Sequence, residues 1–168
     1  MMFRGLIGDL AGKVCKFILP IKYDIFIGSA SSSSIALCTL SSIDLLLEVS
    51  RSDLMNSIAV AGRLLSENKG IDALVRYVVA DKRIRCIVLA GKDSKGHLAG
   101  QSLLALWLNG IDDEGRIIGS MGKDAVLTLS KDEVDEFRAQ ISTMIDMRGV
   151  TDVGSIRKCI MLIQQIRM

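Results

Sequence analysis

With 168 residues and a net charge of +2, the chain has the size of one domain, which buries roughly 70% of its unfolded surface. Hydrophobic residues make up 49% of it and charged residues 24%, so we expect a packed core. Aromatic residues are only 4%, and the basic residues are scattered rather than clustered. Because nucleic-acid binding needs stacking side chains or a concentrated basic face, we expect no nucleic-acid partner.

Cysteine and histidine usage argues against a zinc site. The four cysteines (Cys15, Cys38, Cys86 and Cys159) are far apart without a C-x-x-C pair, and His97 is the single histidine. We therefore expect a reduced, cytoplasmic protein. The longest uncharged stretch, residues 25–43, holds seven serines and is better explained as loop and strand than as a membrane span.

The N-terminal residues 1–22 are predicted to form an amphipathic helical segment that precedes an α/β domain at 23–168. Apolar residues follow helical spacing, and Pro20 ends the pattern. They are Phe3, Leu6, Ile7, Leu10, Val14, Phe17 and Ile18. The expected role of this segment is to pack on the domain or on a second protein chain. The alternative is a membrane-surface helix, but the polar face is not strongly basic.

The first half of the domain is predicted to alternate between strand and helix. Residues 29–34 (SASSSS) indicate a loop, and 35–40 (IALCTL) a short buried strand. Residues 43–50 and 53–65 are predicted helices, the second capped by Ser52. SENKG at 66–70 is expected to break the pattern, with Gly70 in a left-handed turn, before a helix over 71–79.

The second half continues this alternation. Residues 84–91 (IRCIVLAG) are apolar on both faces, which is typical of a central parallel strand. A helix is predicted over 98–108, with Asn109 and Gly110 as its stop. Short strands are expected at 116–119 and 126–129, then a helix from the capping box Ser130–Glu133 to about Met147, and a last helix over 156–166. We thus expect a single Rossmann-like α/β domain, a mostly parallel sheet flanked by helices.

Residues 91–101 (GKDSKGHLAGQ) hold the single histidine at the end of the clearest strand, where α/β sheets bind ligands. The motif begins like a phosphate-binding loop, but His97 and Leu98 stand where that loop needs Lys and Ser or Thr. No G-x-G-x-x-G is present, and no G-x-S-x-G surrounds Ser94 or Ser102. An NTPase, a dinucleotide-binding protein and a serine hydrolase are therefore all disfavoured.

From the residues alone, His97 has two interpretations. A lone histidine in a turn is more often a helix cap or a surface residue than a ligand. The flanking Gly96 and Gly100, however, let a bulky planar group approach the backbone closely. A neutral imidazole there could bind a metal through one nitrogen and would need a partner on the other to fix its tautomer.

Several ordered motifs together resemble one family. The segments are IALCTLS (35–41), SENKGID (66–72), IVLAGKDSKGHLAGQSLLAL (87–106), and NGIDDEGRIIG followed by SMG (109–122). They are similar to the A subunit of tetrahydromethanopterin S-methyltransferase, over roughly residues 35–122.

This resemblance implies a cobamide, a corrinoid of the vitamin B12 type, with a histidine as lower axial ligand of its cobalt. In this sequence that ligand is His97. Lys95 stands where the D-x-H-x-x-G signature of other corrinoid proteins has Asp, so the carboxylate paired with the imidazole must come from elsewhere: Glu67 is the first choice and Asp93 the second. Further expected cofactor contacts are Asn68, Gly96, Leu98, Gln101, Gly119, Ser120, Met121 and Gly122.

The family's chemistry implies that cobalt takes a methyl group from methyl-tetrahydromethanopterin and gives it to coenzyme M. Because no pterin or thiol site is recognisable, we expect the chain to need other methyltransferase subunits. Its end (KCIMLIQQIRM) is far short of a transmembrane helix, which indicates a soluble homologue and leaves sodium coupling in doubt. Two alternatives are a corrinoid-binding or storage protein without transfer activity, and a scaffold that has lost its cofactor.

Overall fold

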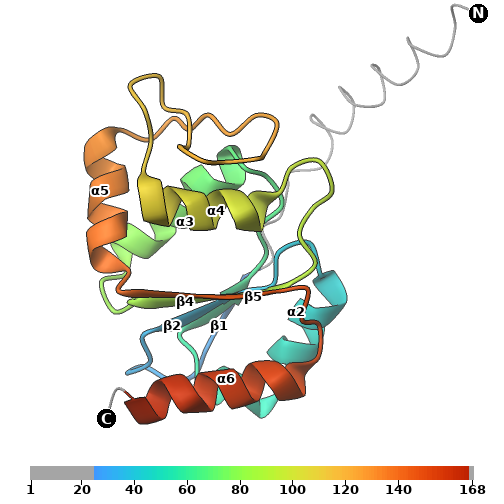
Figure 1. The fold of residues 1–168 in the computed structure, drawn as a ribbon. Coiled ribbons are helices and arrows are strands. Elements are labelled where there is room, and N and C mark those ends of the chain that lie inside the picture. Colours follow the sequence, from blue (N-terminus) through green and yellow to red (C-terminus); the bar gives the residue numbers. More distant parts are fainter. Residues whose placement is uncertain (1–24, 167–168) are drawn as a thin grey trace, which may run out of the picture.

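The computed structural model of the protein describes residues 25–166, so the predicted helical segment at 1–22 lies outside the described residues. A five-stranded sheet with helices on both faces confirms the expected α/β class (Figure 1). The strands are β1 (Ile25–Ile27), β2 (Ile35–Cys38), β3 (Val60–Gly62), β4 (Cys86–Gly91) and β5 (Thr143–Arg148). The helices within the described residues are α2 (Ile43–Ser50), the 3-10 helix η1 (Asp53–Asn56), α3 (Lys69–Ala80), α4 (Ala99–Asn109), α5 (Lys131–Gln140) and α6 (Val153–Ile166).

The strand order is β1–β3–β2–β4–β5, and the sheet is mostly parallel. Strands β3, β2, β4 and β5 run parallel, whereas β1 pairs antiparallel with β3 at one edge. All six residues of β4 are buried, as the predicted central strand requires. A strand covered on both faces can be apolar throughout, because neither face meets water.

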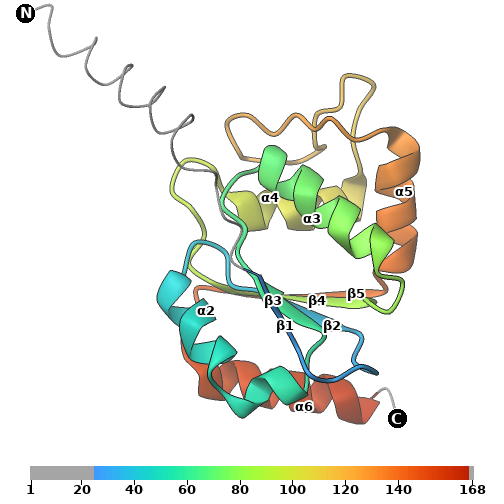
Figure 2. The same cartoon turned by 180° about the vertical axis from the view of Figure 1, so that it is seen from behind.

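The helices form two layers with separate cores (Figures 1 and 2). Helices α3, α4 and α5 cover one face of the sheet, and α2 and α6 cover the other. The two faces of β4 divide between them: Ile87 and Leu89 pack in the core with α3, α4 and α5, while Cys86 and Val88 pack in the core with α2 and α6. This alternation is the period-2 pattern of a strand placed between two helical layers.

The winding of the chain changes direction at β2, which lies between β3 and β4. The loops that follow β2 and β4 therefore leave the same end of the sheet on neighbouring strands. Backbone and side-chain hydrogen bonds join them: Ser41 N donates to Lys92 O over 3.1 Å, and Lys92 N donates to Ser42 Oγ over 2.9 Å. Open α/β sheets bind ligands at such a switch point.

Most predicted elements are confirmed. β2 begins at Ile35, α2 spans the predicted 43–50, and α4 ends at Asn109 with Gly110 as its cap, at a φ of +76°. The capping box at the start of α5 is present, since Ser130 Oγ accepts from Glu133 N, while Glu133 Oε2 accepts from Ser130 N.

The predictions for residues 53–70 are partly wrong. The predicted helix over 53–65 is replaced by η1, whose cap is the predicted Ser52, and by β3. Pairing with β1 and β2 outweighs the local apolar spacing there. Gly70 is not in a left-handed turn either: it is the second residue of α3, which Asn68 caps through its side chain.

Two further corrections concern the sheet. Helix α5 ends at Gln140 rather than near Met147, and the residues assigned to its second half form the edge strand β5. The short strands predicted at 116–119 and 126–129 are single β-bridges, Ile111 with Ile117 and Arg116 with Val126. Strand β1 has no counterpart among the predictions, because its three residues fall within a stretch interpreted as loop and strand.

Candidate functional site

His97 lies at the switch point, in the loop between β4 and α4. Glu67 reaches it from the loop between β3 and α3, so the pair joins segments 30 residues apart. The Glu67 carboxylate Oε2 is 2.8 Å from His97 Nδ1. The glutamate side chain is fully buried, whereas 59% of the histidine side chain is exposed. The resulting site is an outward-facing imidazole held from behind by a buried acid.

The charge on Glu67 is stabilised by donors. Burial alone raises the pKa of this carboxyl, but hydrogen bonds from its own amide, from the Asp124 amide and from His97 outweigh burial and lower the pKa below its usual 4.5. The Asp124 N–H donates to Oε1 over 2.9 Å, leaving Oε2 for the imidazole. Because an ionised carboxylate only accepts hydrogen bonds, His97 carries its proton on Nδ1. Nε2 then points its lone pair away from Glu67.

The turn at residues 119–122 packs directly behind the pair. A Cβ atom at Gly122 would lie 2.6 Å from the His97 carbonyl oxygen and 2.8 Å from Glu67 Cγ, so a side chain has no room there. Gln101 holds the turn in place: its Nε2 donates to Gly119 O, and its Oε1 accepts from Met121 N over 2.8 Å. The predicted site residues Gln101, Gly119, Met121 and Gly122 are therefore brought together behind His97.

Two serines add a hydroxyl pair to this turn. Ser102 Oγ and Ser120 Oγ are 2.7 Å apart, and Ser102 Oγ also donates to Leu98 O. Ser102 is fully buried in the first turn of α4. Ser120 Oγ accepts from Gly122 N over 3.0 Å, which ties the turn to α4.

The loop carrying His97 has an unusual backbone. Gly96 adopts φ +80° with open space around it, and Leu98 adopts φ +47°, a left-handed conformation that is costly for a residue with a side chain. These two residues set the direction of His97 rather than contacting Glu67. Ser94 Oγ in the same loop is buried without a hydrogen-bond partner in the described part of the chain.

Asp93 and Asn68 have structural roles here. The Asp93 carboxylate accepts from Gly100 N and Gln101 N, at 2.9 and 3.0 Å, and lies 3.8 Å from an Arg148 guanidinium nitrogen. Asp93 thus caps α4, and the carboxylate that contacts His97 is Glu67, the first choice from the sequence. The Asn68 side chain accepts from Lys69 N and caps α3.

Sequence reasoning misses Asp124, Ser102 and Arg148 as supports of the site. Asp124 contributes through its backbone N–H, which no side-chain pattern can reveal. Between residues 25 and 166, no group of three or more His, Cys, Asp or Glu side chains gathers as a metal site. A metal ion bound by His97 would therefore have to bring its other donors with it.

Similar chains occur in several archaeal-type genera whose names begin with Methano-. A protein of Methanosarcina acetivorans, whose name provisionally assigns it as the A subunit of a methyltransferase Mtx, is 35% identical over 142 residues, which is 84% of this chain and 67% of the relative. The A subunit of tetrahydromethanopterin S-methyltransferase in Methanocaldococcus jannaschii is 39% identical over 103 residues, 61% of this chain and 43% of the relative. The A subunit numbered 2 of the same enzyme in Methanothermobacter marburgensis is 38% identical over 102 residues, 60% and 55%.

The chain thus spans about two thirds of the first relative and about half of the other two. None of the helices within residues 25–166 has the length and apolar character that crossing a membrane requires. Residues 19–165, which include every residue of the site, match the family described as the A subunit of tetrahydromethanopterin S-methyltransferase. The chain therefore belongs to this family of methyltransferase subunits.

Proposed function

We propose that the chain carries a cobamide, with His97 as the lower axial ligand of cobalt, and serves as the corrinoid-binding component of a methyltransferase. The reaction proposed is transfer of a methyl group from methyl-tetrahydromethanopterin to coenzyme M. The observation that supports it best is the His97–Glu67 pair, in which a buried carboxylate holds Nδ1 of an exposed imidazole. Metal-ligating histidines usually donate their other ring N–H to such a carboxylate.

The donor set fits this cofactor. A corrin ring supplies four nitrogens to cobalt, so the protein needs to add one axial ligand, and His97 Nε2 has no hydrogen-bond partner among the described residues. Met121, on the neighbouring turn, is 72% exposed and offers a polarisable apolar surface to a flat ring. The buried, unpartnered Ser94 Oγ is available to a polar group of the ligand. A bound cobamide would supply a cobalt centre that accepts and passes on a methyl group.

The residues of this chain would control the imidazole. Glu67 keeps the proton on Nδ1, which leaves the Nε2 lone pair free to coordinate. The fixed turn at 119–122 prevents Glu67 from following His97 outward, so a displacement of the imidazole changes the distance between Nδ1 and Oε2. Ligation and the position of the Nδ1 proton are therefore coupled in this proposal.

Other subunits are proposed to supply the donor and acceptor sites. The names of the relatives describe subunits, which implies larger assemblies for those proteins. The alternative is a corrinoid-binding or storage protein without transfer. To decide between them, methylcobalamin-loaded protein is mixed with coenzyme M and co-purified subunits: demethylation supports transfer, and a stable methyl group supports storage.

The test of binding is the visible absorption spectrum after incubation with aquocobalamin and removal of the excess. Wild type should retain the corrinoid with an imidazole-ligated spectrum, and His97→Ala should lose that spectrum. If wild type retains no corrinoid, the proposal fails. If His97→Ala gives the wild-type spectrum, the axial ligand is another group.

Glu67→Gln sharpens this test because it alters the tautomer. The Asp124 N–H needs an acceptor, so the oxygen of the new amide would face it and the amide NH2 would face His97. Nδ1 would then accept and Nε2 would carry the proton, which weakens coordination by about 10–100-fold. Asp124→Asn is the matched control, because its exposed side chain changes in the same way while the backbone N–H remains. Equal titrations of the two variants would contradict the role given to Glu67.

A further inference from the structure

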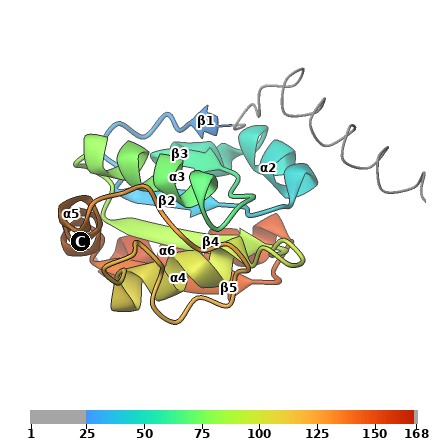
Figure 3. The same ribbon diagram turned by 90° about the horizontal axis from the view of Figure 1, so that it is seen from above.

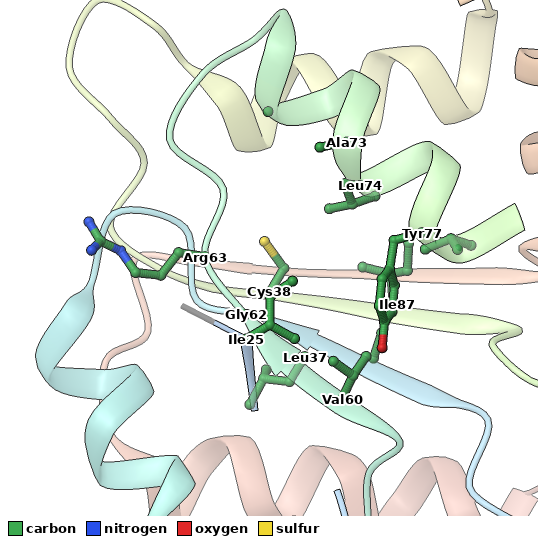
Figure 4. Close-up of a pocket in the computed structure, with 13 residues that line it drawn as sticks. Ile25, Leu37, Cys38, Val60, Gly62, Arg63, Ala73, Leu74, Tyr77 and Ile87 are labelled. Atoms are coloured by element: carbon green, nitrogen blue, oxygen red, sulfur yellow. The ribbon is translucent and has the colours of Figure 1, made fainter. Parts of the chain in front are cut away.

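An apolar groove lies between α3 and the sheet. Strand residues Ile25 and Val60 form its floor, and Leu74 and Tyr77 of α3 form its wall (Figure 4). Its volume is about 140 Å³. Arg63 is the only charged residue in its lining, within the described part of the chain, so the groove suits an apolar occupant rather than a polar ligand.

The groove continues onto the edge strand β1. Ile25 and Ile27 point to the α3 side of the sheet by strand alternation, whereas Phe26 packs in the opposite core with α2 and α6. Ile25 is 44% exposed and Ile27 65% exposed. In the view from above, β1 lies beyond α3, and no described helix covers it (Figure 3). An open apolar edge of this kind is a site where another segment or chain docks.

The sequence supplies an occupant at the right place. Residues 3–18 carry seven apolar residues at helical spacing, and they are separated from Ile25 by only six residues. Six residues span at most about 20 Å, so the segment is confined to the neighbourhood of β1. A tether this short gives an effective concentration on the order of millimolar, which exceeds that of a second copy in dilute solution.

We propose that residues 3–18 dock on this groove with their apolar face, so that the chain covers the β1–β3 edge of its own sheet. The apolar positions of the segment match an apolar surface that begins where the segment joins the fold. This inference is independent of the cofactor: it concerns the edge strand opposite β5, and it stands whether or not His97 binds cobalt.

The experiment uses paramagnetic relaxation in the full-length chain. A spin label is attached to Cys15 in a Cys159→Ser background, where Cys38 and Cys86 are buried and remain unlabelled. Docking predicts that the amide signals of Leu74 and Tyr77 lose most of their intensity. The amide signal of Leu162, on α6 at the opposite face, should keep its intensity.

Matched variants separate docking from general proximity. Leu10→Asp on the apolar face of the segment, and Ile27→Lys at the exposed edge, should restore the Tyr77 signal. Lys16→Asp on the polar face and Leu162→Lys on α6 should leave it broadened. Ile27 is mostly exposed, so its variant is expected to fold.

Mixed samples identify the source of the effect. Spin-labelled protein without isotope is combined with isotope-labelled protein without a spin label. Docking within one chain predicts no broadening in the mixture. Broadening of Tyr77 only in the mixture would show that a second copy occupies the groove, and the absence of broadening in both samples would show that the segment does not dock. Either result overturns the proposal.

Discussion

Replacing Gly122 with alanine tests whether the turn at 119–122 fixes the geometry of the His97–Glu67 pair. The new Cβ atom would lie 2.6 Å from the His97 carbonyl oxygen, 2.8 Å from Glu67 Cγ and 2.8 Å from Ser102 Oγ. The carbonyl belongs to a backbone that leads into the left-handed Leu98, so it has little freedom to move. Glu67, which is fully buried, must then shift.

The expected cost is that of an overpacked site, about 1–3 kcal/mol in the free energy of unfolding. A displacement of Glu67 Cγ also lengthens the 2.8 Å contact with His97 Nδ1. We therefore expect two linked results: a lower urea midpoint with an unchanged m-value, and loss of the hydrogen-bonded Nδ1–H proton signal in the NMR spectrum at neutral pH.

Gly154→Ala is the control for a glycine-to-alanine change without a clash. Its Cβ would meet only Asp152 Oδ1, at 3.4 Å, near the start of α6. This variant should leave the unfolding free energy unchanged or raise it by about 0.5 kcal/mol. If Gly122→Ala behaves like Gly154→Ala and keeps the Nδ1–H signal, the turn does not constrain the pair, and the coupling proposed for His97 loses its structural basis.

Three other perturbations have defined outcomes. Gln140 is buried and donates through Nε2 to three carbonyls (Val78, Asp81 and Ile84), so Gln140→Leu should cost at least about 2 kcal/mol in urea unfolding, and a neutral effect would contradict those bonds. The pKa of Glu67 is lowered in the folded state, so its charge contributes stability above the unfolded value near 4.5 and loses it as pH falls through the folded pKa; the stability gap between wild type and Glu67→Gln should therefore shrink on acidification, and a constant gap would argue against an ionised Glu67. Burial raises the pKa of the Cys38 thiol to about 12, so iodoacetamide at about pH 8 should leave Cys38 unmodified in the folded protein as judged by peptide mapping, and rapid modification would show that its site opens.

The central strand and the site loop were predictable because their burial leaves a plain apolar pattern in the sequence. β4 has both faces covered, so its residues form one apolar run ended by Gly91, whose φ of +80° no other residue adopts as easily. β5 is an edge strand of mixed polarity, TMIDMR, and it closely follows a capped helix without Gly or Pro between them. A local pattern therefore extends the helix, and only pairing with β4 reveals the strand.

The acid of the site was predictable through the resemblance rather than through its local pattern. Glu67 belongs to SENKG, whose polar residues indicate an exposed turn, yet its side chain is fully buried. Asp93, four residues before His97, is nearer in sequence but turns away to cap α4. Sequence distance is a poor guide here because loops from adjacent parallel strands meet at one end of the sheet, whatever the length of chain between them.

The burial of Glu67 itself argues that this residue serves His97. Moving a carboxylate out of water costs several kcal/mol, and the donors around it offset that cost without making the arrangement more stable than an apolar packing of the same volume. A fold that needed only to fill this space would be served as well by leucine or methionine. What an apolar residue could not do is hold a proton on Nδ1 of an exposed imidazole and leave Nε2 able to coordinate. The buried charge is thus explained by the histidine in front of it, and the fixed turn at 119–122 by the need to keep the two 2.8 Å apart.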